Sequence, residues 1–200
     1  MAVSAKNSSK QPDAVQMLKA DHKLVKKLFD QFRAASANEK THLADRLFTE
    51  LTIHSTLEEE IFYPAVRSKF EPADVLESSD EENGLDMSET GEEEEKQDLE
   101  AEGIDRMKLQ SDEEEGGEEV IAQAYEEHQT VEELIEQLKT LDPQSSDYQY
   151  LFTKLEDAVL EHIDGEEDVI LPVAASQLDV QTLGVAMQQR RDDLSSSLAA

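Results

Sequence analysis

The chain has 200 residues, with 18 Lys or Arg against 48 Asp or Glu, so its formal net charge is −30. A protein this acidic lacks the basic face that nucleic-acid binding requires, so we expect no nucleic-acid partner. The absence of cysteine excludes disulfide frameworks, thiolate zinc sites, iron–sulfur clusters and cysteine nucleophiles.

The chain carries neither the pattern of a secretion signal nor that of a membrane span. Residues 1–11 form a polar tail without the apolar core of a signal peptide. No apolar run approaches the roughly 18 to 20 residues needed to cross a bilayer. We therefore expect a soluble, cytoplasmic protein with no membrane partner. The length suits one domain that carries a long insertion.

Residues 12–70 are predicted to form a first helical hairpin. Its first helix starts near Pro12, because proline suits a first helical turn. Its second helix covers roughly 39–70, and the short connection at 34–38 makes the two helices antiparallel neighbours. Apolar residues step by three and four along both, which is the spacing of one buried stripe. The stripe residues are Val15, Leu18, Val25, Phe29 and Phe32, then Leu43, Leu47, Leu51, Ile61 and Ala65.

Residues 71–117 form an acidic, low-complexity insertion. Between Glu71 and Glu119 the chain carries 22 acidic residues against 3 basic ones, and no aromatic residue. Such a segment cannot bury enough apolar surface to offset its ordering entropy, so we expect disorder, with a weak helical pattern at 99–109. We favour a solvated linker. The alternatives are a segment that docks an unknown protein partner under serine phosphorylation, and a weak collector of divalent cations.

Residues 118–194 are predicted to form a second helical hairpin followed by a C-terminal helix. The hairpin helices cover roughly 118–141 and 147–174, and Pro143 breaks the helix between them. A further helix at 178–194 is expected along the outside. The stripe residues are Ile121, Ala124, Val131, Ile135 and Leu138, then Phe152, Leu155, Val159, Val169 and Val173. The predicted fold class is all-α, an up-down-up-down four-helix bundle with the acidic insertion between the second and third helices.

The two hairpins repeat one polar pattern. A histidine lies on the stripe of each first helix, and a His-x-x-x-Glu pair followed by proline lies on the stripe of each second helix. The histidines are 32 residues apart in one hairpin and 34 in the other, and proline follows the second histidine by ten residues in both. These residues are His22, His54, Glu58 and Pro64, then His128, His162, Glu166 and Pro172. An internal duplication of a helical hairpin explains the match.

Six polar side chains are therefore expected to point into the middle of one bundle. A histidine and a glutamate four residues apart lie on one helix face, and here that face is the buried one. Buried imidazoles and carboxylates are costly unless they are paired or bound to metal. The predicted metal-site residues are His22, His54, Glu58, His128, His162 and Glu166.

The donor types narrow the choice of metal. Imidazole plus carboxylate suits iron, manganese or zinc, whereas sites made only of oxygen suit magnesium or calcium. Two symmetric carboxylates can each bridge two ions. With a bridging oxide or hydroxide, each of two six-coordinate ions keeps roughly one open position. Open positions indicate reactivity or ligand binding rather than a closed structural site.

This pattern resembles the hemerythrin-like family, also called the HHE cation-binding domain. The stretches 54–64 and 124–128 are similar to its signature strings, and the resemblance covers about residues 13–70 and 117–194. It implies a four-helix bundle that holds two iron ions in a non-haem centre with an oxo or hydroxo bridge. The implied ligands are His22 and His54 for one iron, His128 and His162 for the other, and Glu58 and Glu166 as bridges.

The chain departs from the oxygen-carrying hemerythrins, which have a fifth histidine one turn from another on the third helix. The positions one turn from His128 are Ala124 and Glu132, so this histidine is missing. Glu132 and Tyr125 are the candidates to fill the vacancy. Resemblance to the four-histidine members implies catalase-like breakdown of hydrogen peroxide and a role in oxidative stress. The alternative is a non-enzymatic protein that binds or senses iron, O2 or NO, and a zinc or manganese protein would share the same ligands.

Several polar residues are expected to lie outside this set. His42 precedes His54 by twelve residues, about 120° round the helix, so it should lie on the surface. The expected solvated residues are Glu59, Glu60 and Glu167, one of them a candidate hydrogen-bond partner of a ligand. Tyr63 and Tyr125 are expected at the core or rim rather than in redox chemistry.

Overall fold

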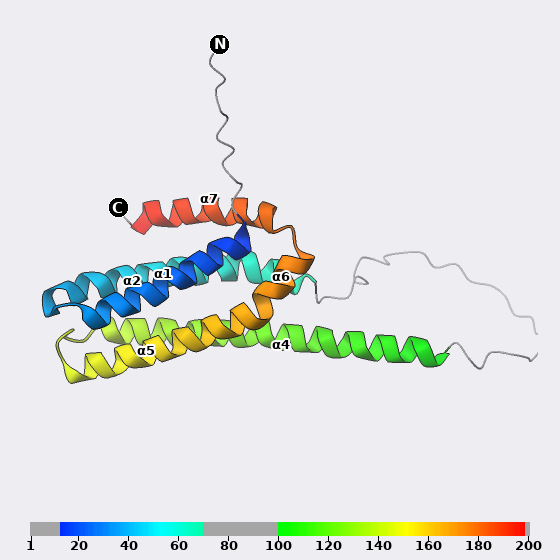
Figure 1. Cartoon of the computed structure of the whole chain (residues 1–200), viewed down its shortest axis with the longest axis horizontal. Coiled ribbons are helices and arrows are strands. Elements are labelled where there is room, and N and C mark those ends of the chain that lie inside the picture. The colour runs from blue at the N-terminus through cyan, green and yellow to red at the C-terminus, as the bar shows by residue number, and fades with distance from the viewer. Residues whose placement is uncertain (1–12, 70–99, 199–200) are drawn as a thin grey trace, which may run out of the picture.

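A computed structural model describes residues 13–69 and 100–198, with side chains described for 13–69 and 117–197. Four long helices make the bundle: α1 (Ala14–Ala34), α2 (Ala37–Leu57), α4 (Glu100–Lys139) and α5 (Ser146–Gly165). Figure 1 shows α1 and α2 side by side above the pair α4 and α5. The predicted all-α four-helix bundle is confirmed.

Two of the bundle helices continue through a short π-helical turn into another α-helix. Helix α2 is followed by the π-turn η1 (Glu58–Phe62) and then by α3 (Tyr63–Arg67). Helix α5 is followed by the π-turn η2 (Glu166–Ile170) and then by α6 (Leu171–Gln177). A final helix, α7 (Val180–Leu198), lies outside the bundle along α1 and α2, where the sequence predicted a C-terminal helix (Figure 1).

The helix starts follow local capping. The side chain of Asp13 accepts a hydrogen bond from the backbone N–H of Gln16 at 3.1 Å, so α1 begins at Ala14. The predicted start at Pro12 lies outside the described residues. At the start of α2, the Glu39 carboxylate accepts from the backbone N–H of Ser36 at 3.0 Å. Such caps replace backbone partners that a helix end lacks.

Helix α4 begins earlier than the sequence predicted. We expected its start near Glu118, but it begins at Glu100. It therefore includes the last part of the acidic insertion, both nearly all of the weak helical pattern at 99–109 and the residues after it. Extending a formed helix costs far less than nucleating one, and this stretch contains five Glu residues, which favour helix, and no proline. The rest of the insertion, residues 71–99, lies outside the described residues.

Two apolar clusters form the core, and the predicted polar residues lie between them. On α1, Leu18 belongs to one cluster and Val25 to the other, with His22 between. On α4, Ala124 and Val131 flank a histidine in the same way. In the cluster towards the hairpin connections, the Phe32 and Phe152 rings stack with centroids 3.6 Å apart.

The π-turns shift the buried stripe by one residue in both hairpins. Regular α-helical spacing predicted Ile61 and Val169 in the core, but their neighbours Phe62 and Ile170 are buried, while Val169 is exposed. The N–H of Tyr63 bonds to the carbonyl of Glu58, and that of Leu171 to Glu166, each five residues back. A π-turn adds one residue to the turn, so every later residue rotates to the next position on the helix face.

Within the described ranges, no single helix is long and apolar enough to cross a membrane. The one combination that meets that length and composition joins 146–177 with 180–197, and these two arms are bent by 115°.

Candidate metal centre

The structure brings all six predicted side chains into one buried cluster. One histidine comes from each of the four bundle helices, and the two glutamates begin the π-turns. None of the six is more than 7% exposed. They are His22, His54, Glu58, His128, His162 and Glu166. His42, expected on the surface, is exposed.

The four imidazoles present Nε2 to the centre of the cluster, where the two carboxylates meet them. Glu58 Oε2 lies 3.2 Å from Nε2 of His54 and 3.3 Å from Nε2 of His128. Glu166 Oε2 lies 3.2 Å from Nε2 of His22 and 3.6 Å from Nε2 of His162. Each glutamate therefore spans the two hairpins, because its oxygen touches one histidine of each.

Several inward atoms of this cluster lack a hydrogen-bond partner among the described residues. Both carboxylate oxygens of Glu58, one oxygen of Glu166, and Nε2 of His22 and His54 are buried and unpaired. Leaving such groups unpaired costs about 1 to 3 kcal/mol each, and more for charged groups. A bound cation would satisfy these atoms together, so the residues present fit a metal.

The donor atoms form two overlapping groups, each small enough for one ion. One group joins His22, His54, Glu58 and Glu166, and the second joins Glu58, His128 and His162, with the atoms of each group within 4.8 Å of one another. Imidazole and carboxylate donors suit iron, manganese or zinc.

A carboxylate meets the outward Nδ1 of every histidine in the cluster. Glu167, Glu59 and Glu127 lie 2.9 Å from Nδ1 of His22, His128 and His162, respectively, and Asp21 lies 3.5 Å from that of His54. The three contacts at 2.9 Å are hydrogen bonds, and a carboxylate hydrogen-bonded to Nδ1 keeps the proton there, which leaves the Nε2 lone pair free for a metal. The Asp21 contact is longer, and Nδ1 of His54 has no hydrogen-bond partner among the described residues.

These four carboxylates repeat with the internal duplication. The acid before the first histidine of each hairpin, Asp21 or Glu127, meets the second histidine of the same hairpin. The acid after the motif glutamate, Glu59 or Glu167, meets the first histidine of the opposite hairpin. Sequence analysis singled out Glu59 and Glu167 only as solvated residues with one candidate partner, and it missed Asp21 and Glu127. The acid-His step repeated at 21–22 and 127–128 was the available signal.

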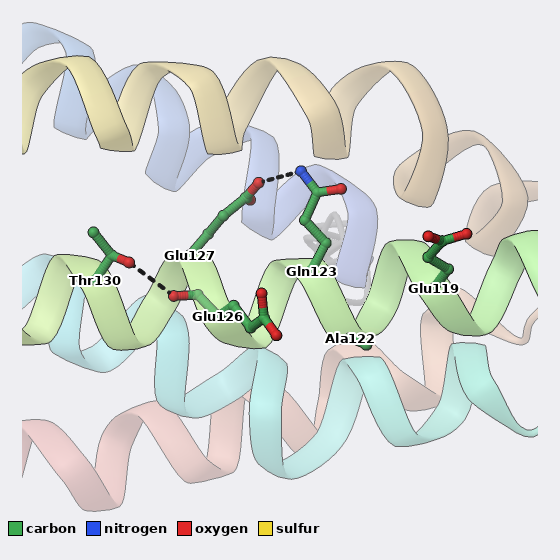
Figure 2. Close-up of a pocket in the computed structure, with 6 residues that line it drawn as sticks. All are labelled: Glu119, Ala122, Gln123, Glu126, Glu127 and Thr130. Carbon is green, nitrogen blue, oxygen red and sulfur yellow. Dashed lines mark hydrogen bonds between the residues drawn. The ribbon is translucent and has the colours of Figure 1, made fainter.

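Glu127 is held from the outer surface of the bundle. Figure 2 shows it on α4 among the residues that line a surface pocket, with its carboxylate next to the side-chain amide of Gln123. That amide donates to Glu127 Oε1 at 2.8 Å, while the other oxygen of Glu127 meets His162. The hydrogen bond to His162 and that from Gln123 outweigh burial and keep the pKa of Glu127 below its usual value.

One tyrosine makes the two halves of the cluster unequal. Tyr63 is fully buried, and its hydroxyl donates to Glu166 Oε1 at 2.8 Å and lies 3.4 Å from Nε2 of His128. The corresponding residue of the second hairpin is Leu171, which has no polar group. Neither candidate for the missing histidine enters the cluster. Tyr125 donates to the backbone carbonyl of Glu59 at 3.2 Å, and Glu132 is exposed.

Burial and nearby charges shift the pKa values of the two central carboxyls, Glu58 and Glu166, in opposite directions. Burial, and then the charge of Glu166, raise the pKa of Glu58 well above its ordinary value. Burial alone would raise the pKa of Glu166, but the close contact with His22 and the charges of the nearby histidines lower it to about 2. Without metal, the pair therefore holds one proton and one negative charge. A cation would remove that difference, because its own charge favours both ionised forms.

A small cavity adjoins the histidines. Its volume is about 20 Å³, and apolar side chains close most of its wall. The lining residues are the four cluster histidines, Val25, Leu51, Ser55, Val131, Val159 and Ile163. A water molecule needs roughly 10 to 15 Å³ measured in this way, so the cavity suits a ligand of very few atoms.

Two comparisons relate this architecture to known proteins. Residues 13–107 and 92–174 each match the sequence profile described as the Hemerythrin HHE cation binding domain. The fold is similar to the crystal structure of a Hemerythrin HHE cation binding domain-containing protein from Mycobacterium kansasii. The TM-score is 0.61 at 19% identity, covering 94% of this chain and 93% of that one. At this identity the likeness shows the fold alone. No curated protein matches the sequence.

Proposed function

The chain belongs to the hemerythrin HHE cation-binding domain family, and from that premise we propose that it is a non-haem di-iron protein that breaks down hydrogen peroxide. The observation that carries the proposal is a buried His/Glu cluster, whose donor atoms form two groups that could each hold one ion, beside a cavity of about 20 Å³.

The ligand assignment follows the two groups of donor atoms. His22 and His54 would hold one iron, and His128 and His162 the other. Glu58 and Glu166 would be shared, which is supported by the contact of each glutamate oxygen with one histidine of each pair. The Asp and Glu side chains at Nδ1 would hold each imidazole ring in its ligating orientation.

The cavity supports a small, uncharged substrate. Its aliphatic wall excludes bulk water and offers an anion no positive charge in compensation. Hydrogen peroxide is uncharged, and its few atoms suit the small volume of the cavity. When bound, the iron pair would supply the two-electron redox change that peroxide breakdown needs. In the balanced reaction, 2 H2O2 give 2 H2O and O2, so one peroxide is reduced, the other is oxidised, and no outside reductant is required.

The chain's own residues have separate tasks in this proposal. The Tyr63 hydroxyl holds a proton at Glu166 Oε1, next to the histidine cluster. The valines of the cavity limit access to small molecules. Within the described residues, the site offers no lysine or arginine to the cavity, which agrees with an uncharged ligand.

The test is metal analysis followed by an assay of oxygen release. Protein from iron-rich medium, purified in air, should contain about two irons per chain, show near-ultraviolet bands of an oxo-bridged pair, and release O2 from peroxide over many turnovers. The His42→Ala variant should behave as wild type, because His42 is exposed and away from the cluster. Zinc alone, or two irons without O2 release, would overturn the peroxide proposal.

A second candidate is a non-enzymatic protein that binds or senses iron, O2 or NO. One observation favours it: α7, which lies outside the four-helix bundle, reaches the cluster through Asp21. Such a protein would retain iron and turn peroxide over slowly, while its conformation would respond to iron or to the bound gas.

A further inference from the structure

Helix α7 places a charged residue on its inward face. Gly184 and Met187 are buried, and Arg191 and Leu194 continue the same stripe at steps of four and three. Apolar contacts of Met187 with the core hold this helix to the bundle. An arginine on an inward stripe is costly unless a partner compensates its charge.

The partner of Arg191 is Asp21 on α1. Arg191 Nη1 donates to Asp21 Oδ1 at 2.9 Å, and Nη2 donates to Oδ2, so the guanidinium and the carboxylate meet through two parallel hydrogen bonds. The side chains are 21% and 12% exposed, so water screens this pair only partly. A bidentate pair of this kind fixes the carboxylate in orientation as well as in position.

Asp21 is also the carboxylate that faces His54. Its Oδ2 lies 3.5 Å from His54 Nδ1, an ion-pair contact that is longer than a hydrogen bond and leaves Nδ1 without another partner among the described residues. The corresponding acids at the other three histidines are more open to solvent, at 28% to 40% exposure, and among the described residues none of those three is paired with an arginine. His54 is therefore the histidine of the cluster whose outer partner is held by a helix from outside the bundle.

The neighbouring arginine provides a contrast within one helix turn. Arg190 also makes two hydrogen bonds to a carboxylate, at 2.6 and 2.8 Å, but its partner is Glu60. Glu60 is about half exposed and contacts no histidine of the cluster. The two arginines thus attach α7 to the bundle with similar ion pairs. Of the two carboxylate partners, only Asp21, the partner of Arg191, also contacts a predicted metal ligand, His54.

We propose that Arg191 is a positioning residue for the metal centre, which orients His54 through Asp21 and so links the docking of α7 to the affinity of the His22/His54 metal position. The inference rests on the metal site of the proposed function and is independent of the peroxide reaction. Linkage between two equilibria is reciprocal, so metal bound at His54 must strengthen α7 docking by the same factor.

The experiment compares Arg191→Gln with Arg190→Gln as a matched control, since both remove one charge and one bidentate pair from α7. Zn2+ is titrated into metal-free full-length protein against a chelating dye. Arg191→Gln should lower the affinity of one of two zinc ions by about 10- to 100-fold, the usual effect of losing an outer partner, whereas Arg190→Gln should keep both affinities. Arg191→Lys should recover part of the loss, because it restores the charge without the bidentate geometry.

A second readout follows the helix itself. Amide hydrogen exchange in residues 180–198 should slow when zinc binds to the wild type or to Arg190→Gln. In Arg191→Gln, zinc binding should slow this exchange by a smaller factor. Circular dichroism and the thermal midpoint identify any variant that fails to fold, and Asp21→Asn then tests the same link from α1. Equal zinc affinities in the two arginine variants would overturn the inference while leaving the metal site standing. A wild-type protein that binds no metal would overturn both.

Discussion

Glu59 Oε1 lies 2.9 Å from His128 Nδ1, although the two residues are 69 positions apart and belong to opposite hairpins. Glu167 of the second hairpin makes the same contact with Nδ1 of His22 in the first hairpin, at 2.9 Å. Each hairpin therefore supplies a carboxylate that orients a histidine of the other. The metal centre depends on the docking of the two hairpins and not only on the helix that carries each ligand.

Removal of Glu59 should weaken metal binding without disturbing the fold. Glu59→Ala leaves His128 Nδ1 without its partner, so we expect a loss of metal affinity of about 10- to 100-fold. Glu60→Ala is the control, since Glu60 contacts Arg190 on the surface. Competition with a chelating dye measures both. Equal affinities for the two variants would show that the Glu59 contact does not orient His128.

Replacement of a shared glutamate should abolish the proposed two-metal centre. Glu58→Ala or Glu166→Ala removes an oxygen donor that contacts both hairpins, whereas His42→Ala removes an exposed side chain. Metal analysis should give about two ions per chain for His42→Ala and fewer for the glutamate variants. The same metal loss in all three variants would contradict the ligand assignment.

The metal-free protein should lose stability in acid because of His128. Burial, together with the charges of His162 and His54, lowers the pKa of His128 to about 3, against about 6.5 in an unfolded chain. Between these values the unfolded state binds a proton that the folded state does not. The stabilisation is therefore fully present above pH 6.5 and is lost as the pH falls towards 3. The lowered pKa of His54 acts in the same direction.

Urea unfolding at pH 7 and pH 5 checks this effect. His128→Leu removes the titrating group, so it should lose less stability between the two pH values than wild type, by on the order of 1 to 2 kcal/mol. The raised pKa of Glu58 acts with the opposite sign and is present in both proteins. Parallel losses for wild type and variant would contradict the neutral state of His128.

Loss of the Tyr63 hydroxyl should destabilise the metal-free protein. Tyr63→Phe keeps the buried ring but removes the donor to Glu166, whose low pKa keeps it ionised. Hydrogen bonds to charged groups contribute about 1.5 to 3 kcal/mol, and we expect a loss in that range in urea unfolding at pH 7. Tyr125→Phe is the matched control, because its hydroxyl meets only a backbone carbonyl near the surface. A Tyr63→Phe variant as stable as the control would contradict the contact.

The order of the helices, the duplication and the six residues that meet at the centre could all be predicted from the sequence. These follow from local spacing: a step of three or four residues selects one helix face, and His54 and Glu58 share that face because they are one turn apart. Even the position of His42 outside the cluster follows from this rotation. The π-turns do not, because regular α-helical spacing carries no sign of an added residue. Ile61 and Val169 were therefore assigned to the core in place of Phe62 and Ile170.

The contacts between residues of different helices could not be predicted in this way, because they depend on how the helices pack. The partners of His22 and Asp21 lie 145 and 170 positions away in the chain, at Glu167 and Arg191. Periodicity gives the direction of a side chain from its own helix axis, but not the height at which another helix packs beside it. The outer carboxylates, the tyrosine at Glu166 and the arginine of α7 all depend on that height, because a shift of one turn, about 5.4 Å, would separate every one of these contacts.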